Sequence, residues 1–357
     1  MTTNHGLVTL KRLKVVAIIV AINIFVISVI YISAEMLFSR INKRDKMNYS
    51  YLSNGREVSF FVFDANLKYK PLPSSDVEVI KTIKGKEIYH PVYSIDGYSR
   101  RITPVENREI RNKYVLFFGC SFVFGEGLND DQTLPYYFSQ NAPGYMPYNY
   151  GFIGYGTQHM LARLSDDDTR KQVPEKQGIL IYLFIDDHVC RAAGTLRVRS
   201  WAKGPLLYYM DKDGNITKNP GSGTRNTFWV SVFDTMNKSQ TISYIERKYP
   251  SLDIPPIGDR EIYLAFRIIE ESRNNYRKDF NNDAFYVVFF PGSKYSSSLI
   301  PYLNKAGIKY FDYSSLLDYF HNDRYWVSPL DYHPGPRINS VLAKTLAKDL
   351  NIYGSER

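Results

Sequence analysis

The sequence predicts a three-layer α/β/α protein with a parallel sheet between two layers of helices. Two observations support this prediction. From residue 114 onward, short strand-like runs alternate with helical patterns, as they do in chains built of βαβ units. The longest of these runs are continuously apolar, which indicates strands that are covered on both faces.

Five strands are expected in this sheet, at residues 114–118, 146–149, 178–185, 284–290 and 309–311. Helical periodicity separates them near residues 131–140, 156–164, 260–280, 296–306 and 336–350. Residues 191–258 interrupt the alternation and carry a predicted hairpin at 208–216. A long insertion after a strand often shapes a binding site, so we expect it near the site.

The N-terminal region contains a run of 20 residues without a charge, at positions 15–34. A helix rises about 1.5 Å per residue, so this run covers a hydrocarbon core of about 30 Å. Lys11, Arg12 and Lys14 precede it, an arrangement that fits a signal-anchor whose N-terminus is cytoplasmic. The sequence therefore predicts a membrane anchor.

The alternative is a signal peptide that is cleaved after Ala34. The apolar core of such a peptide is about 7–15 residues long, so the longer run favours an uncleaved anchor. Basic residues also follow the run, at Arg40, Lys43 and Arg44, and charge bias therefore does not settle the topology. We expect the catalytic domain outside the cytoplasm, because long domains translocate largely regardless of charge.

Four segments are expected along the chain. They are a basic tail at 1–14, a transmembrane anchor at 15–37, a stalk and β-rich lead-in at 38–110, and a catalytic domain at 111–352 with its insertion at 191–258. Strand-like runs at 57–63 and 89–95 suggest the β-rich character of the lead-in.

The net charge is +9 over 357 residues, which favours anionic partners such as a membrane surface. The basic residues are spread along the chain, and no nucleic-acid module is recognisable, so nucleic acid is not an expected partner. Neither a phosphate-binding glycine motif nor a metal-ligand spacing occurs. No cofactor and no metal are therefore predicted.

Two short segments can carry nucleophilic chemistry. Ser121 follows Gly119 at the end of the first core strand, where its hydroxyl would be exposed near backbone N–H groups of the next helix. Asp331 and His333 precede the last helix, and a histidine oriented by a carboxylate is a suitable base for a serine. Each segment alone is more typical of a turn or a helix cap. Together they predict Ser121 as nucleophile, His333 as base and Asp331 as its orienting acceptor.

The blocks at 117–127 and 149–157, with Asp331 and His333, resemble those of the SGNH/GDSL hydrolase family in its membrane-anchored bacterial form. The resemblance covers about residues 112–350. It implies a flavodoxin-like sheet of about five parallel strands, and ester or acyl-transfer chemistry without a cofactor. It also implies an oxyanion hole formed by the backbone N–H groups of Ser121 and Gly154.

The chain departs from the family pattern at three places. Cys120 replaces the aspartate before the nucleophile, and Asp331 and His333 are two residues apart rather than three. The third block has Asp187 and His188 where the family has an asparagine that donates to the oxyanion. Either a protonated Asp187 or His188 would then be the side-chain donor, or the hole has only its two backbone donors.

In a flavodoxin-like sheet the strands before Cys120 and Cys190 are neighbours, which raises the hypothesis of a disulfide between them. For function, we expect an anchored serine esterase or deacylase that acts on an O-acyl ester, such as an acylated envelope carbohydrate. One alternative is a polysaccharide O-acyltransferase that receives acyl groups from a multi-pass membrane partner. The other is a degenerate SGNH module that binds without catalysis.

Overall fold

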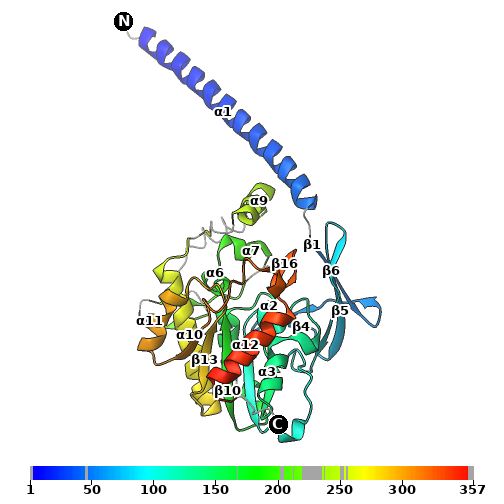
Figure 1. The fold of residues 1–357 in the computed structure, drawn as a ribbon. Helices are drawn as coiled ribbons and strands as arrows, with labels where there is room; N and C mark the ends of the chain where they lie inside the picture. The colour runs from blue at the N-terminus through cyan, green and yellow to red at the C-terminus, as the bar shows by residue number, and fades with distance from the viewer. Residues whose placement is uncertain are drawn as a thin grey trace.

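A computed structural model describes residues 3–44, 47–166, 168–201, 205–211, 213–218, 235–236, 238–249, 253–254 and 256–352. Figure 1 shows a long N-terminal helix that leads to an α/β body, with the C-terminus at the far end of that body. Parts of the predicted insertion at 191–258, including 219–234, lie outside the described residues.

Helix α1 (Thr3–Arg44) is continuous and contains the predicted anchor. Its segment Leu13–Asn42 contains an 18-residue window with a mean hydropathy of 3.0, and no residue of that window is buried. This helix is long and apolar enough to cross a membrane, a criterion that a signal sequence near the N-terminus also meets. The helix continues to Arg44, into the segment predicted as a stalk.

The central sheet has five parallel strands in the order β14-β13-β10-β8-β9. Their bounds are β8 Lys113–Phe118, β9 Tyr145–Asn149, β10 Gln177–Phe184, β13 Phe285–Phe289 and β14 Lys309–Asp312. This order is flavodoxin-like, because the first strand of the sheet lies between the second and the third. The prediction of five parallel strands is confirmed, with ends that differ by at most one residue.

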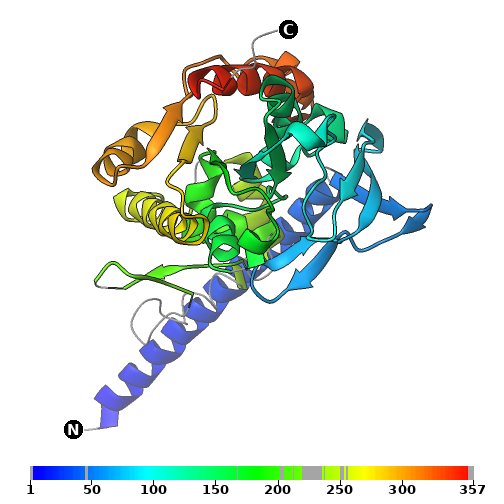
Figure 2. The same cartoon turned by 90° about the horizontal axis from the view of Figure 1, so that it is seen from below.

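Helices cover both faces of this sheet. Figure 2 shows the body from below, with helices on either side of the strands. Leu116 and Phe118 of β8 belong to one apolar core, while Val115 and Phe117 belong to the other. The first core packs on α4 (Thr157–Leu164), α6 (Asp187–Ala193), α10 (Asp259–Phe280) and α11 (Ser296–Lys305), and the second on α3 (Leu134–Asn141) and α12 (Pro336–Asp349). The three-layer class is thereby confirmed.

The lead-in forms an antiparallel sheet of its own around β5 (Ser75–Ile83). The other strands are β1 Met47–Ser53, β2 Arg56–Glu57, β6 Lys86–Tyr89 and β7 Val92–Ile95, with a separate hairpin of β3 Phe61–Asp64 and β4 Lys68–Pro71. The sequence predicted one strand over 57–63, which is broken between β2 and β3, and missed β5. The buried face of β5 contains Val77, Val79 and Lys81, and the lysine obscures its apolar alternation.

Several short elements complete the body. The predicted hairpin in the insertion is present as β11 (Tyr209–Met210) and β12 (Ile216–Thr217). A second hairpin joins β15 (Trp326–Ser328) to β16 (Asp331–Pro334). The short helices are α2 Ser121–Phe124, α5 Asp168–Lys171, α7 Leu196–Trp201, α9 Gln240–Lys248, η1 Arg108–Ile110, η2 Asp130–Gln132 and η3 Asp323–Tyr325.

Candidate active site

The predicted nucleophile, Ser121, is the first residue of α2, directly after β8. A side chain at Gly119 would place its Cβ 2.6 Å from Cγ2 of Val123, so this tight turn requires glycine. Arg101, at the end of the lead-in, stabilises this turn. Its Nη1 donates to the carbonyls of Phe124 (2.9 Å) and Gly125 (2.6 Å). The sheet and the lead-in together position Ser121.

The predicted base and its acceptor both lie on β16. Residues two apart on a strand project from the same face, so the two-residue spacing brings Asp331 and His333 together. Oδ1 of Asp331 lies 2.6 Å from Nδ1 of His333 and also accepts from the backbone N–H of His333 at 3.1 Å. Nε2 of His333 lies 2.9 Å from Oγ of Ser121. The structure thus brings the three predicted residues into one hydrogen-bonded chain.

Glu126 is a fourth member of this group that sequence reasoning did not assign. Its Oε2 lies 3.1 Å from Nε2 of His333, the same nitrogen that faces Ser121. Its Oε1 accepts from the hydroxyls of Tyr89 (2.9 Å) and Tyr49 (3.2 Å), and its side chain is buried. An ionised carboxylate only accepts hydrogen bonds, so Nε2 carries a proton when it faces Glu126.

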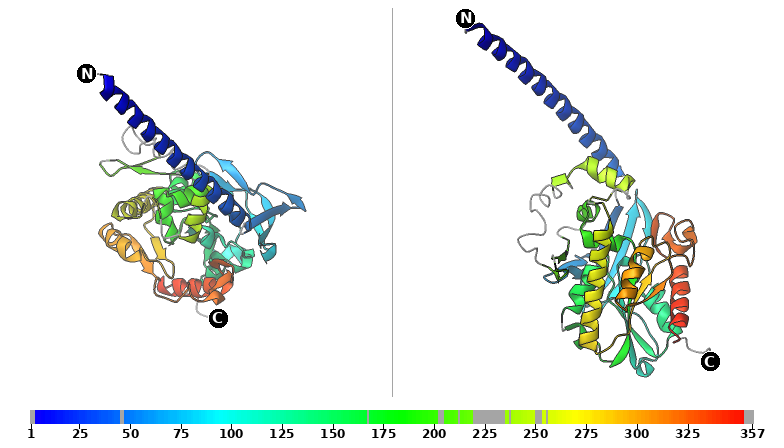
Figure 3. Two further views of the ribbon diagram at one scale, coloured as in Figure 1. Left: turned by 90° about the horizontal axis from the view of Figure 1, so that it is seen from above. Right: turned by 90° about the vertical axis from the view of Figure 1, so that its left-hand side faces the viewer.

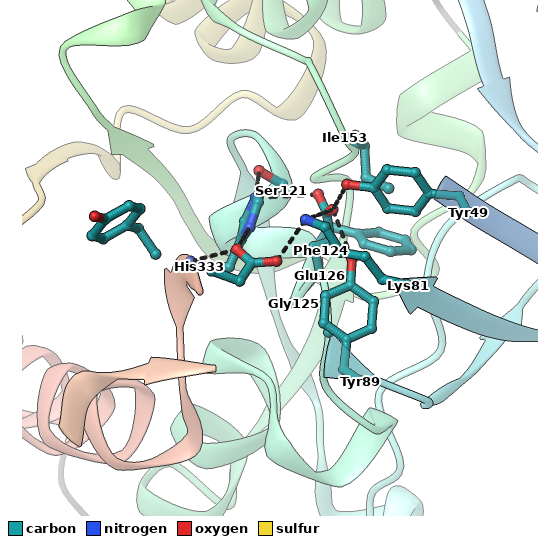
Figure 4. Close-up of polar contacts among 12 residues, drawn as sticks. Tyr49, Lys81, Tyr89, Ser121, Phe124, Gly125, Glu126, Ile153 and His333 are labelled. Carbon is teal, nitrogen blue, oxygen red and sulfur yellow. Dashed lines mark hydrogen bonds and ion pairs between the residues drawn. The ribbon is translucent and has the colours of Figure 1, made fainter. Parts of the chain in front are cut away.

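Lys81 completes the group from the central strand of the lead-in. Its Nζ lies 2.6 Å from Oδ2 of Asp331 and 4.0 Å from Oε1 of Glu126, and its side chain is buried. Figure 4 shows Tyr49, Lys81 and Tyr89 around Glu126, with His333 and Ser121 beside it. No local motif marks these lead-in residues, because only the tertiary packing of the two sheets brings them to the site.

The charges of this group determine the protonation of His333. Burial alone would lower the pKa of His333, but Glu126 and Asp331 outweigh it and raise that pKa to about 10. Burial would raise the pKa of Asp331 and of Glu126, but His333 and Lys81 hold both below their usual values. At neutral pH the group therefore holds two carboxylates, one ammonium and one imidazolium.

The second predicted block is fixed to the nucleophile turn by Asn149 at the end of β9. Its Nδ2 donates to the carbonyl of Val123 at 3.0 Å, and its Oδ1 accepts from the N–H of Gly151 at 3.0 Å. Gly154, three residues further along, borders the same cavity as Ser121. The two glycine- and serine-containing loops that were predicted to supply backbone donors therefore lie at one cavity.

The third block does not supply the predicted side-chain donor. Asp187 borders the cavity but pairs with Arg197 (3.0 Å) and Arg191 (3.5 Å). Burial would raise the pKa of Asp187, yet the two arginines outweigh it and lower that pKa, so the carboxylate is an acceptor rather than a donor. Arg191 borders the cavity as well and places a positive charge there.

His188 lies in the core, fully buried, and is not among the residues that line the cavity. Its Nδ1 is 2.6 Å from the hydroxyl of Tyr182, and its Nε2 has no hydrogen-bond partner among the described residues. Burial lowers the pKa of His188 well below its usual value, so this imidazole is neutral. The position of His188 contradicts a direct role in the oxyanion hole.

The hypothesis of a disulfide between Cys120 and Cys190 is wrong, because both are free thiols in the structure. Cys190 lies on α6, and its Sγ donates to Oδ2 of Asp253 at 3.3 Å. Arg197 also pairs with Asp253, at 3.3 Å. Neighbouring strands are therefore not sufficient to bring the two sulfur atoms together.

A cavity of about 730 Å³ opens above Ser121 and His333. Phe122, Ile153 and Phe290 contribute apolar walls, while Glu126 and Arg191 contribute charge. Ligand sites typically measure about 300–1,000 Å³, so this one has room for an acyl group together with part of the alcohol that carries it.

No family model matches the chain, and no curated protein matches it either. Three solved structures resemble it. A lipolytic protein of the G-D-S-L family from Veillonella parvula has a TM-score of 0.35 at 10% identity, over 67% of this chain and 97% of that one. An acetyl xylan esterase from Butyrivibrio proteoclasticus has 0.38 at 11%, over 87% and 86% of the respective chains. A carbohydrate esterase family 2 enzyme from Corynascus thermopiles has 0.36 at 10%, over 86% and 87%.

These scores and identities are low, so the functional argument rests on the geometry of the site. The strand order and the helix layers, observed in the chain itself, are those that the resemblance to the SGNH/GDSL hydrolases implies. The chain has a flavodoxin-like three-layer α/β/α fold.

Proposed function

We propose that this chain is a serine esterase or deacylase that cleaves an O-acyl ester through an acyl-enzyme. One observation supports it above all. Nε2 of His333 is 2.9 Å from Oγ of Ser121 while Asp331 holds the opposite ring nitrogen at 2.6 Å. A nucleophile, a base within hydrogen-bond reach and an acceptor that orients the base are the elements of nucleophilic acyl transfer.

The first half of the reaction forms the acyl-enzyme. A neutral His333 takes the proton of Ser121 as Oγ bonds to the ester carbonyl carbon. The resulting oxyanion lies near the backbone N–H groups of Ser121 and Gly154. The imidazolium that forms faces both Asp331 and Glu126. His333 then returns the proton to the leaving alcohol as the carbon–oxygen bond breaks.

The second half repeats these steps with a new acceptor. In hydrolysis, His333 takes a proton from water, which attacks the acyl carbon, and Ser121 leaves with the proton. In acyl transfer, a sugar hydroxyl replaces water. A multi-pass membrane partner would then supply the acyl group.

The proposed location is a membrane with the catalytic domain on its extracytoplasmic side. The length and composition of α1 support an anchor, and the basic residues that precede it support a cytoplasmic N-terminus. An acylated carbohydrate of the cell envelope is the proposed substrate class, since such esters occur on that side.

The test is hydrolysis of an activated acetyl ester by the full chain in detergent, compared with Ser121→Ala. We expect the rate to fall by about 10³-fold or more in the variant. Ser59→Ala, an exposed serine of the lead-in, is the matched control and should keep the parent rate. Equal rates for the parent and Ser121→Ala would instead indicate a non-catalytic binding module.

Hydrolysis and transfer are separated by following the acyl group. Incubation with an acylated donor and a polysaccharide gives free acetate if water is the acceptor, and an acetylated glycan if a sugar hydroxyl is. Both products should disappear in Ser121→Ala, because both reactions pass through the same acyl-enzyme.

A further inference from the structure

Glu35 of α1 adds acceptors at the N-terminus of α9, a helix from the insertion whose N-cap residue is Ser239. The carboxylate of Glu35 accepts from the backbone N–H groups of Gln240 (2.8 Å) and Thr241 (3.2 Å), and from the hydroxyl of Ser239 (2.5 Å). The first N–H groups of a helix have no partner within that helix, and a negative charge at this end is stabilising. Glu35 therefore fixes the start of α9.

Two more contacts continue along the same face of α1. The rings of Phe38 and Tyr244 stack with centroids 4.5 Å apart, and Nδ2 of Asn42 donates to the carbonyl of Gln240 at 3.0 Å. Positions 35, 38 and 42 follow the spacing of one helical face. Figures 1 and 3 both show α9 against the lower end of α1, on top of the body.

The depth of this contact follows from the sequence of α1. The uncharged run ends at Ala34, so Glu35 is the first charged residue beyond it. The headgroup layer on each side of a bilayer is about 5–8 Å thick. The segment from Glu35 to Asn42 advances by about 10 Å, since each residue adds about 1.5 Å. When residues 15–34 occupy the hydrocarbon core, α9 lies at the level of the headgroups.

The composition of α9 suits that position. Ile245 is 41% exposed and Tyr249, directly after the helix, is 52% exposed. Residues 238–249 carry three basic residues and one acidic one. Apolar and tyrosine side chains next to basic ones are typical of helices that lie in a membrane interface and attract anionic lipids.

We propose that α9 lies on the bilayer surface as a second membrane contact, which turns the mouth of the catalytic cavity toward the membrane. This inference rests on the proposed anchor and on the proposed function, and it adds a substrate class to that function. The ester is one held at the membrane surface, by a lipid or another amphiphilic group, rather than one free in solution.

The cavity mouth lies on the side of the body where α1 ends. Met47, three residues after α1 ends, lines the cavity and is exposed. Leu330 and Tyr332 of the β15–β16 hairpin line it too and are also exposed. The carboxyl ends of the strands face α1, whereas the C-terminus is at the opposite end of the body in Figure 1. An apolar entrance on this side can receive an amphiphile from the bilayer surface.

The contact is tested by tryptophan quenching in the full chain, reconstituted in phosphatidylcholine–phosphatidylglycerol vesicles whose lipids are brominated near the headgroup. Ile245→Trp is compared with Ile110→Trp, a matched exposed isoleucine (56%) that precedes β8 at the opposite edge of the sheet. With the parent signal subtracted, we expect several-fold stronger quenching at position 245. Equal quenching at the two positions would overturn the proposal.

The contact between α1 and α9 is tested by Glu35→Ala, with soluble and membrane-bound substrates measured side by side. We expect this variant, carrying the Ile245→Trp probe, to lose quenching. We also expect the rate on a long-chain ester in vesicles, divided by the rate on a soluble acetyl ester, to fall several-fold. An unchanged ratio together with unchanged quenching overturns the proposal, as does intact-mass evidence that α1 is removed. If the soluble ester is not cleaved, the proposed function fails, while the quenching still decides the membrane contact.

Discussion

Two imidazoles lie near the carboxyl edge of one sheet in opposite electrostatic environments, His333 half-buried and His188 fully buried. His333 lies between the carboxylates of Asp331 and Glu126, and its pKa rises to about 10. His188 contacts the hydroxyl of Tyr182, and its pKa falls well below the usual value through burial and the nearby charge of Arg191. Burial lowers the pKa of both imidazoles, and at His333 the neighbouring carboxylates outweigh it.

The difference originates in the lead-in. Glu126 is held by Tyr49 and Tyr89, and Asp331 is held by Lys81, all of which come from strands of the lead-in sheet. No such strand reaches His188, which packs beneath β10 between Tyr182 and Phe184. A segment outside the predicted catalytic domain thus creates the environment of the base.

The largest expected difference between the two histidines is catalytic. His333→Ala should lower the rate on an activated ester by about 10³–10⁴-fold, because the base is lost. His188→Ala should keep the rate per folded molecule within about threefold while it destabilises the core by about 2–4 kcal/mol. Rates are normalised to the folded fraction from thermal unfolding. Complete inactivity of folded His188→Ala would restore a catalytic role to the third block.

Glu126→Gln tests whether the second carboxylate sets the protonation of His333. In the parent, the rate should rise with pH toward about 10, as His333 loses its proton. The variant should shift the midpoint of this rise down by about one unit or more and lower the alkaline plateau by about tenfold per unit. Rates near neutral pH should change little, since Glu126 faces an imidazolium in both the protonated enzyme and the transition state.

The matched control for this experiment is Glu106→Gln, an exposed glutamate that precedes β8. Its pH–rate profile should superimpose on that of the parent. A midpoint that stays in place in Glu126→Gln would show that the carboxylate does not act on the base.

The stability of the fold should respond to pH in opposite directions at the two histidines. The pKa of His188 is lowered, so its imidazole is protonated in the unfolded chain but not in the folded one below pH about 6.5, and stability is lost as pH falls. The pKa of His333 is raised, so its contribution is present below pH about 6.5 and is lost as pH rises through about 10. Unfolding temperatures measured from acid to alkaline pH should therefore decline at both ends.

His188→Phe isolates the acid limb of that profile. The variant takes up one fewer proton on unfolding. The slope of its unfolding free energy against pH should therefore be smaller by up to about 1.4 kcal/mol per pH unit. His159 is buried with a pKa lowered to about 3 by burial and by Arg191 and Arg163, so it should maintain part of the acid limb in the variant. An acid limb that is unchanged by His188→Phe would mean that this imidazole is charged in the folded state.

Lys81→Met should have the smallest effect on the pH–rate profile, and it should shift the midpoint in the opposite direction to Glu126→Gln. Removal of one positive charge leaves two carboxylates around His333, so the midpoint of the pH–rate profile should move up rather than down. We expect the rate near neutral pH to change little, because His333 is an imidazolium in both the protonated enzyme and the transition state, with Lys86→Met, an exposed lysine of β6, as the matched control. A downward shift would contradict the charge balance inferred for the site.

Local patterns were sufficient for the layered fold. The apolar runs that became β8, β10 and β13 are continuous because both faces of those strands are covered, and such runs are visible without any knowledge of tertiary contacts. Ser121 and His333 were predictable for a related reason, because each lies just past a recognisable strand or before a recognisable helix.

The rest of the site depends on contacts between distant segments. Lys81 occupies a buried position of β5, where a lysine contradicts the pattern of an apolar face, and its partner Asp331 is 250 residues away. Glu126 lies inside the block at 117–127 that was recognised from the sequence. Its role, however, depends on hydrogen bonds from Tyr49 and Tyr89 of the lead-in. His188 was one of the alternatives for an oxyanion donor, but the first turn of α6 directs it into the core, an orientation that strand and helix patterns do not encode.

The hydrogen bonds from Arg101 to the nucleophile turn have a consequence for shorter fragments of the chain. A fragment that starts at residue 111 keeps the whole parallel sheet and all three residues of the hydrogen-bonded chain, yet it lacks this guanidinium and the ammonium beside Asp331. It would also expose Phe124 and Phe152, which pack on Phe60 of the lead-in. The smallest working unit of this protein therefore begins near the end of α1, well before its parallel sheet.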